Sequence, residues 1–252
     1  MENQVTQLLK AMVKPDYTAC SYAFMQDGKI VCADAIGVID KINNQPITTD
    51  CTFNVCSISK IYCTVCIMQL VDGGLIQLED KVADILPEFT MKDERYKDIT
   101  VRMCLDHSSG LPGTQWKHFS VSTTSKFDYY SEVLNYLSNS TLKADPGTYS
   151  TYCNDGFTLA EMVVSKVRNM PYEDVLKKYI TEKIGANSTN TTYTIHSDYP
   201  LVSEGKKPKE YFPIQGAGGI TTSMIDLCKF GQLFLEPHSI ISEKSKALMA
   251  KS

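Results

Sequence analysis

Apolar and polar positions near the N-terminus predict a short helix followed by a β-hairpin. Two short runs of apolar and β-forming side chains, residues 20–25 and 30–36, are joined across Asp27-Gly28. Asp-Gly between such runs is a strong hairpin signal, so we expect an antiparallel pair of strands. The helix is expected at residues 3–13, with these apolar side chains on one side: Val5, Leu8, Leu9 and Met12.

The segment 61–71 is apolar almost all round. A helix that is hydrophobic on every side is buried, so this pattern predicts a core helix. A polar connection, residues 40–50, leads toward it, and Asp72-Gly73-Gly74 ends it. The stretch 54–60 (NVCSISK) is therefore expected at the N-terminus of a buried helix.

Beyond residue 75 the pattern predicts helices separated by long loops. Gly and Pro enforce turns at residues 107–113 and at Pro146-Gly147. Residues 187–213 show little periodicity, and we find no internal repeat. The expected helices are residues 101–105, 127–137, 157–167, 172–184 and 223–235, the last with Ser223 near its cap.

Composition and charge exclude some classes of partner. The 252 residues are enough to bury a core, and the composition is ordinary for a globular protein. A net charge of -4 without a basic run argues against nucleic acid. The N-terminus lacks the basic-then-apolar order of a signal peptide, and no apolar run reaches the length of a membrane span. We therefore expect a soluble, cytoplasmic protein with no nucleic acid and no membrane partner.

Cysteine, histidine and glycine clusters do not indicate a metal or a phosphate site. The chain has nine cysteines, which without an export signal are expected as free thiols. Cys63 and Cys66 form a C-x-x-C inside the apolar segment, where packing is favoured over a redox or metal half-site. The four histidines lack metal-ligand spacing. The glycines of residues 216–219 lack the spacing of a phosphate loop, which favours close backbone packing.

Ser57 and Lys60 form the candidate chemistry at the start of the buried helix. Residues three apart share a helix face, so the Lys60 amine is expected beside the Ser57 hydroxyl. A hydroxyl next to an amine that can accept a proton is an activated nucleophile, and a helix N-terminus favours negative charge on its oxygen. The alternative is that Ser57 only caps the helix, as serine often does.

Several separated stretches together resemble one family. The S-x-x-K spacing is typical of β-lactamases and penicillin-binding proteins. Each of the stretches given below is a weak signal by itself. In their order and spacing, over residues 22–235, the stretches together resemble the class C β-lactamase, penicillin-binding protein, esterase and D-peptidase group. The stretches are Ser57-Ile58-Ser59-Lys60, the turn at 107–112, Pro146-Gly147-Thr148, Tyr152-Cys153-Asn154, Gly218-Gly219-Ile220 and Asp226-Leu227.

The resemblance implies acyl transfer to serine without a metal or organic cofactor. It gives Ser57 the role of nucleophile and Lys60 that of its proton partner. Tyr152 would move protons to and from the serine and the leaving group, and Asn154 would orient substrate and Lys60. Alternation along an extended segment requires Cys153, between them, to point away from the site. His107 is expected to hold the turn at 108–113.

The sequence departs from the family in its C-terminal part. The family's third motif, Lys or His, then Thr or Ser, then Gly, lies on a strand that also supplies an oxyanion N–H. No such triplet follows Gly219. We therefore expect an incomplete sheet, with self-association through its open edge, and little or no hydrolase activity of this chain unless further strands are supplied.

These observations combine into one interpretation of the fold and function. We expect an α/β (α+β) protein of the β-lactamase/transpeptidase-like fold, an antiparallel sheet flanked by helices plus a helical region. Residues 1–252 form a single unit, with residues 1–58 and 214–252 on the sheet side and residues 59–213 helical. The expected function is a serine hydrolase, an esterase or peptidase before a β-lactamase, acting on a small-molecule ester, amide or β-lactam carbonyl. The alternative is a non-catalytic or truncated relative that can be acylated but does not turn over.

Overall fold

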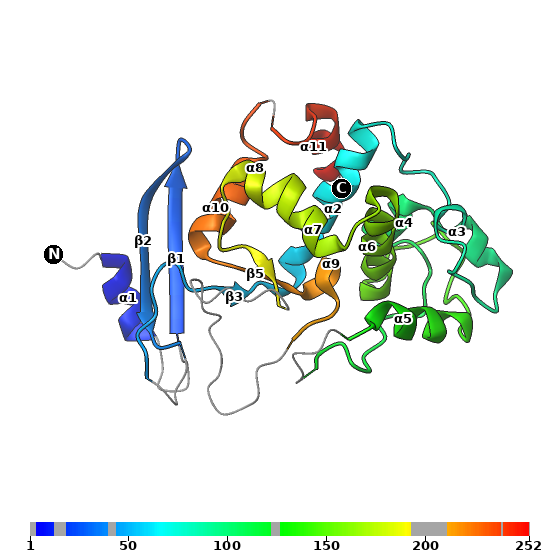
Figure 1. Cartoon of the computed structure of the whole chain (residues 1–252), viewed down its shortest axis with the longest axis horizontal. Helices are drawn as coiled ribbons and strands as arrows, with labels where there is room; N and C mark the ends of the chain where they lie inside the picture. The colour runs from blue at the N-terminus through cyan, green and yellow to red at the C-terminus, as the bar shows by residue number, and fades with distance from the viewer. Residues whose placement is uncertain are drawn as a thin grey trace.

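The computed structural model describes residues 4–12, 19–39, 44–121, 127–192, 211–237 and 239–251. A β-hairpin with one helix lies at one end of the molecule, and the other helices fill its middle and its opposite end (Figure 1). The strands are β1 (Ala19–Gln26), β2 (Lys29–Gly37), β3 (Phe53–Asn54), β4 (Asn190–Thr191) and β5 (Ile220–Thr222). The helices are α1 (Gln4–Met12), α2 (Ser59–Asp72), α3 (Val82–Ile85), α4 (Val101–Leu105), α5 (Tyr129–Ser138), α6 (Asn154–Arg168), α7 (Tyr172–Leu176), α8 (Glu182–Ile184), α9 (Gln215–Gly218), α10 (Met224–Gln232) and α11 (Glu243–Met249), with shorter turns η1 (Cys56–Ile58), η2 (Glu94–Asp98) and the π-helical η3 (Lys177–Thr181).

The predicted hairpin is confirmed. β1 and β2 pair antiparallel, and both turn residues have positive φ, 50° at Asp27 and 71° at Gly28. Asp-Gly accepts this left-handed backbone, which matches the twist of the strands. Helix α1 contacts β2, and α10 contacts both strands. Self-association through this sheet stays a prediction.

Helix α1 joins the hairpin through polar contacts as well as apolar ones. The Thr6 hydroxyl donates to Asp34 Oδ2 at 2.5 Å and lies 2.8 Å from the Tyr22 hydroxyl. Leu8, which the periodicity placed on the apolar side, is 60% exposed. The expectation for Leu8 was wrong because the partly buried face of the helix centres on Thr6, whose hydroxyl has partners on the sheet.

Helix α2 is the buried helix that its all-round apolar pattern predicted. It contacts α6, α7, α9 and α11, and most of its side chains are nearly inaccessible. Cys63 and Cys66 are free and fully buried, and burial raises the pKa of the Cys66 thiol to about 12. A thiol of that kind is a packing group and not a reactive one.

A second, small sheet was not predicted. Its strand order is β3-β5-β4, and both pairings are antiparallel. β3 directly precedes the Ser57 turn, and β4 lies in the stretch that lacks periodicity. Strands of two or three residues are too short to show alternation, so hydrophobic periodicity could not reveal them.

One helical prediction needs correction, and helix α11 was missed. The single helix expected at residues 172–184 is instead α7, the π-helical turn η3 and α8. Helix α11 was not predicted, because it has a largely polar sequence. Its N-cap Ser242 accepts from the Ser245 N–H, and both hydroxyls donate to Asp72 at the end of α2.

None of the helices among the described residues is long and apolar enough to cross a membrane. The division into a sheet-side layer and a helical region stays a prediction.

Candidate active site

Ser57 lies in η1, between β3 and the start of α2. Asn54 fixes this turn: its Oδ1 accepts from the Cys56 N–H at 3.1 Å, and its Nδ2 donates to the Gly218 carbonyl at 2.9 Å. Cys56 has a φ of 48°, which is uncommon for a residue other than Gly and turns the chain into the helix. Asn54 was missed as a positioning residue, although an asparagine two residues before a turn N–H is an Asx-turn signal.

The buried amine of Lys60 faces Ser57, as the helical spacing predicted. Lys60 is only 7% exposed. Its Nζ donates to Ser57 Oγ at 3.3 Å, to Asn154 Oδ1 at 2.7 Å and to the Ala217 carbonyl at 2.7 Å. Three acceptors match the three N–H donors of an ammonium group, so the geometry suits a protonated lysine.

Tyr152 approaches Ser57 from the other side. The two hydroxyl oxygens are 2.5 Å apart, and Lys60 Nζ lies 4.6 Å from the centroid of the Tyr152 ring. Cys153 is buried, and its thiol donates to the Gly113 carbonyl at 3.4 Å. The predicted alternation is therefore confirmed: Tyr152 faces Ser57, Asn154 holds Lys60, and Cys153 points away.

His107 supports the segment that carries Tyr152. Its Nδ1 accepts from the Cys153 N–H at 3.2 Å, its carbonyl accepts from the Thr151 N–H at 2.9 Å, and its ring lies 4.5 Å from the Tyr152 ring. The imidazole must be unprotonated at Nδ1 to accept this bond. Burial, and next the charge of Lys60, lower the pKa of His107 from 6.5. His107 therefore positions Tyr152 in addition to its expected place in the turn.

We expect His107 to make stability depend on pH. Between its lowered pKa and 6.5 the unfolded chain binds a proton that the folded protein does not. The contribution of His107 to the unfolding free energy is therefore constant above pH 6.5 and lost as the pH falls below it. In His107→Asn, an amide oxygen can replace Nδ1 without titrating, and Asn tolerates the positive φ of 64°. Urea denaturation from pH 5 to 8 should show a shallower acid-side loss in the variant, and identical slopes would contradict this role.

Asp155 contributes a pH dependence of the opposite sign. Both carboxylate oxygens accept from the Gln115 N–H, at 3.0 and 2.9 Å, yet burial raises the pKa of Asp155 to about 7. Between pH 3.8 and about 7 the folded protein therefore keeps a proton on Asp155 that the unfolded chain has lost. The contribution of Asp155 to the unfolding free energy consequently falls as the pH rises through this range. Because Asp155 is present in both proteins, the effect of His107 is the difference in unfolding free energy between the wild type and His107→Asn at each pH.

Helix α9 brings a backbone carbonyl to Lys60 by close packing. A Cβ on Gly216 would lie 3.1 Å from Cys63 Sγ, and one on Gly219 would lie 2.5 Å from the Phe212 carbonyl oxygen. The expected close backbone packing of this glycine cluster is confirmed. This packing places the Ala217 carbonyl against Lys60 Nζ. The sequence does not single out this carbonyl, because every residue has one.

Gly219→Ala should therefore destabilise the fold by about 1–3 kcal/mol, the usual cost of overpacking. Gly231 is a matched control: it lies in α10, and nothing lies within 4 Å of an added Cβ. Gly231→Ala should be neutral or gain up to about 1 kcal/mol, since alanine is the better helix former. Thermal denaturation of both variants measures this, and equal shifts would contradict the packing argument.

The four residues singled out from the sequence, Ser57, Lys60, Tyr152 and Asn154, thus lie together. A serine hydroxyl between a tyrosine oxygen and an ammonium group can pass its proton to the tyrosine oxygen when that oxygen is deprotonated, and the ammonium group stabilises the negative charge that develops. Ser57 also lies in the first turn of the helical segment, where backbone N–H groups lack intrahelical acceptors. This arrangement is chemically suited to nucleophilic attack on a carbonyl carbon.

Known proteins resemble this chain in sequence. The sequence profile of the family described as Beta-lactamase matches residues 5–252. The chain is 26% identical over 244 residues to penicillin-binding protein 4* of Bacillus subtilis (strain 168), covering 88% of this chain and 53% of that protein. It is 24% identical over 199 residues to the D-alanyl-D-alanine-carboxypeptidase/endopeptidase AmpH of Escherichia coli (strain K12), covering 77% and 51%.

A solved structure shows the same fold. The octameric penicillin-binding protein homologue from Pyrococcus abyssi superposes with a TM-score of 0.79 at 23% identity, covering 98% of this chain and 59% of that one. The predicted β-lactamase/transpeptidase-like fold is therefore confirmed. The chain spans about half the length of the curated relatives it matches.

Proposed function

Because the chain belongs to the β-lactamase family, we propose that it is a serine hydrolase that forms an acyl-enzyme on Ser57. The observation that carries the proposal is the position of Ser57 Oγ, 2.5 Å from the Tyr152 hydroxyl and 3.3 Å from Lys60 Nζ. A serine hydroxyl is a weak nucleophile until a neighbouring group takes its proton. Here the Tyr152 oxygen lies within reach of that proton, and Lys60 Nζ lies beside the Ser57 oxygen.

We assign proton transfer to Tyr152 and charge stabilisation to Lys60. All three Lys60 donors already have acceptors, including the Ala217 carbonyl, so an ammonium fits this site better than a neutral amine. We propose that Tyr152, as the phenolate, accepts the Ser57 proton during attack and that the resulting phenol returns this proton to the leaving group.

The developing oxyanion needs hydrogen-bond donors. In the first helical turn, the Cys56 N–H is used by Asn54 and the Ile58 N–H by the Val55 carbonyl. The Ser57 N–H, between them, is the donor that we propose for the oxyanion, reinforced by the positive end of the helix.

We propose small-molecule esters, amides or β-lactams as the substrate class. Two similar proteins carry names of this kind, a penicillin-binding protein and a D-alanyl-D-alanine-carboxypeptidase/endopeptidase. All three substrates present a carbonyl carbon to a serine nucleophile. The pocket around a nucleophile, and not the fold, selects among them.

The test is incubation with benzylpenicillin and, separately, with p-nitrophenyl acetate. We expect a penicilloyl adduct that peptide mass spectrometry maps to Ser57, and release of p-nitrophenol beyond one equivalent. A stable adduct without turnover would instead favour an acylable, non-catalytic relative. An adduct on another serine, or no reaction with either compound, would overturn the proposal.

A further inference from the structure

A buried glutamate lies behind the helix that supplies the third acceptor of Lys60. Glu161 is on α6 and is fully buried. Its Oε2 accepts from the Gly216 N–H at 2.7 Å, and its Oε1 accepts from the Tyr130 hydroxyl at 2.6 Å. Gly216 directly precedes Ala217, whose carbonyl accepts from Lys60 Nζ at 2.7 Å. The backbone of residues 216–217 therefore connects the Glu161 carboxylate to the Lys60 ammonium group.

Helix α6 acts on Lys60 through two side chains on one of its faces. Asn154 and Glu161 are separated by close to two full helical turns, so they lie on the same face of α6. Asn154 Oδ1 accepts from Lys60 Nζ directly, at 2.7 Å. Glu161 acts on the same ammonium group through the backbone that carries the Ala217 carbonyl. α6 therefore helps to place two of the three acceptors of Lys60.

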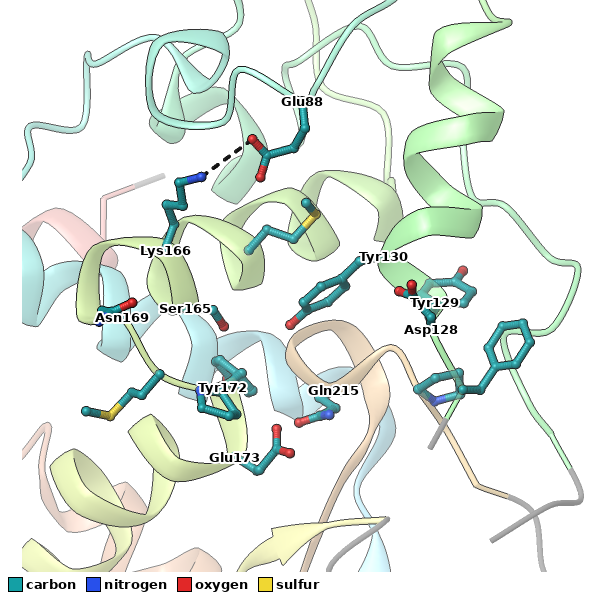
Figure 2. A pocket seen from close by; sticks show the side chains of 15 residues that line it. Glu88, Asp128, Tyr129, Tyr130, Ser165, Lys166, Asn169, Tyr172, Glu173 and Gln215 are labelled. Carbon is teal, nitrogen blue, oxygen red and sulfur yellow. Dashed lines mark ion pairs between the residues drawn. The ribbon is translucent and has the colours of Figure 1, made fainter. Parts of the chain in front are cut away.

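The hydrogen bonds of Glu161 suit an ionised carboxylate held in one direction. A backbone N–H can only donate. The Tyr130 phenol keeps the proton that it donates, because burial, and next the charge of Glu161, raise the pKa of Tyr130 well above 10. Figure 2 shows Tyr130 extending from α5 toward α6 and the start of α9, which carry Ser165 and Gln215. A Cβ on Gly216 would lie 3.2 Å from Glu161 Oε2, so glycine leaves room for this contact.

We propose that Glu161 is a positioning residue: it holds α9 so that the Ala217 carbonyl fixes the Lys60 ammonium group beside the nucleophile. The inference rests on the proposed function, in which Ser57 is acylated. The bond from Lys60 Nζ to Ser57 Oγ is 3.3 Å long, whereas the other two bonds of the ammonium group are both 2.7 Å. The two shorter bonds set the direction of the ammonium group, and its approach to the serine oxygen follows from them.

Three variants of Glu161 separate the reach of the side chain from its charge. Glu161→Gln keeps an oxygen for the Gly216 N–H, and its amide group can donate to the Tyr130 oxygen, so it should react within about threefold of the wild type. Glu161→Asp keeps the charge but is one methylene group shorter, and Glu161→Met removes the acceptor. Both should slow acylation by about 10- to 100-fold, the usual effect of misplacing a site group by about 1 Å.

The measurement is the second-order rate constant for labelling of Ser57 by a fluorophosphonate, followed by mass spectrometry. The fraction of molecules labelled at the end counts the folded protein, so a lower rate constant with an unchanged final fraction reports positioning and not unfolding. Asp226→Leu is the matched control for Glu161→Met. Asp226 is also buried and accepts from a backbone N–H, that of Ser188, at 2.7 Å. Its rate constant should stay within about twofold of the wild type, because Ser188 lies in a segment that bonds to none of the four site residues among the described part of the chain.

A second readout does not need acylation. In ¹H–¹⁵N correlation spectra, three acceptors should keep the hydrogens of the Lys60 ammonium group in slow exchange with water in the wild type and in Glu161→Gln. In Glu161→Asp this signal should broaden or disappear. If the wild type were not labelled on Ser57, the proposed hydrolase function would fail, and an unchanged Lys60 signal in Glu161→Asp would separately overturn the positioning role. A rate constant for Glu161→Asp at or above that of Glu161→Gln, or equal losses in Glu161→Met and Asp226→Leu, would also overturn it.

Discussion

Replacement of Ser57 by alanine is expected to abolish both acylation and turnover. The nucleophilic oxygen is lost, and removal of a serine nucleophile typically costs at least about 10⁴-fold in rate. The measurement is the rate of p-nitrophenol release together with mass spectrometry after incubation with benzylpenicillin. Turnover by Ser57→Ala within tenfold of the wild type would contradict the assignment.

The fold should tolerate this change. Ser57 is exposed, and its hydroxyl faces Tyr152. The N-cap residues of η1 and α2 are Val55 and Ile58, and neither makes a side-chain capping bond, so Ser57 does not cap the helix. The alternative view of Ser57 as a simple cap therefore has no support in the geometry. We expect the unfolding free energy to change by no more than about 0.5 kcal/mol. A large loss of stability would make the activity result uninformative, so circular dichroism melting accompanies it.

Tyr152→Phe is expected to slow acylation by about 10²- to 10⁴-fold, the usual contribution of a positioned acid–base group. The variant removes one oxygen, which lies 2.5 Å from Ser57 Oγ, and leaves the ring against Lys60 and His107. The second-order rate constant for reaction with a fluorophosphonate or with p-nitrophenyl acetate measures the effect.

Tyr149→Phe provides the matched control. Tyr149 is 55% exposed and Tyr152 is 54% exposed, and both lie in the same connection before α6. The control should react within twofold of the wild type. Equal losses in the two variants, or a Tyr152→Phe rate within threefold of the wild type, would remove Tyr152 from the proton-transfer role.

The local part of the candidate site could be predicted from the sequence because short-range geometry fixes it. Lys60 faces Ser57 because residues three apart share a helix face, and Tyr152 and Asn154 point the same way because an extended chain alternates. The buried helix α2 could be predicted because its apolar pattern is long. The hairpin could be predicted because Asp27-Gly28 accepts a left-handed backbone. Each of these features is set by neighbours in the chain.

The tertiary structure decided which of these local pieces meet. Lys60 receives its third acceptor from the Ala217 carbonyl, 157 residues away, and every residue carries a carbonyl, so the sequence does not single this one out. The small sheet that fixes Asn54 consists of two- and three-residue strands, which carry no periodic signal. His107 acquires its positioning role only through packing between distant segments. Local patterns specify helices, turns and the direction of a side chain, whereas hydrogen-bond partners and cavities depend on contacts that no short stretch of sequence contains.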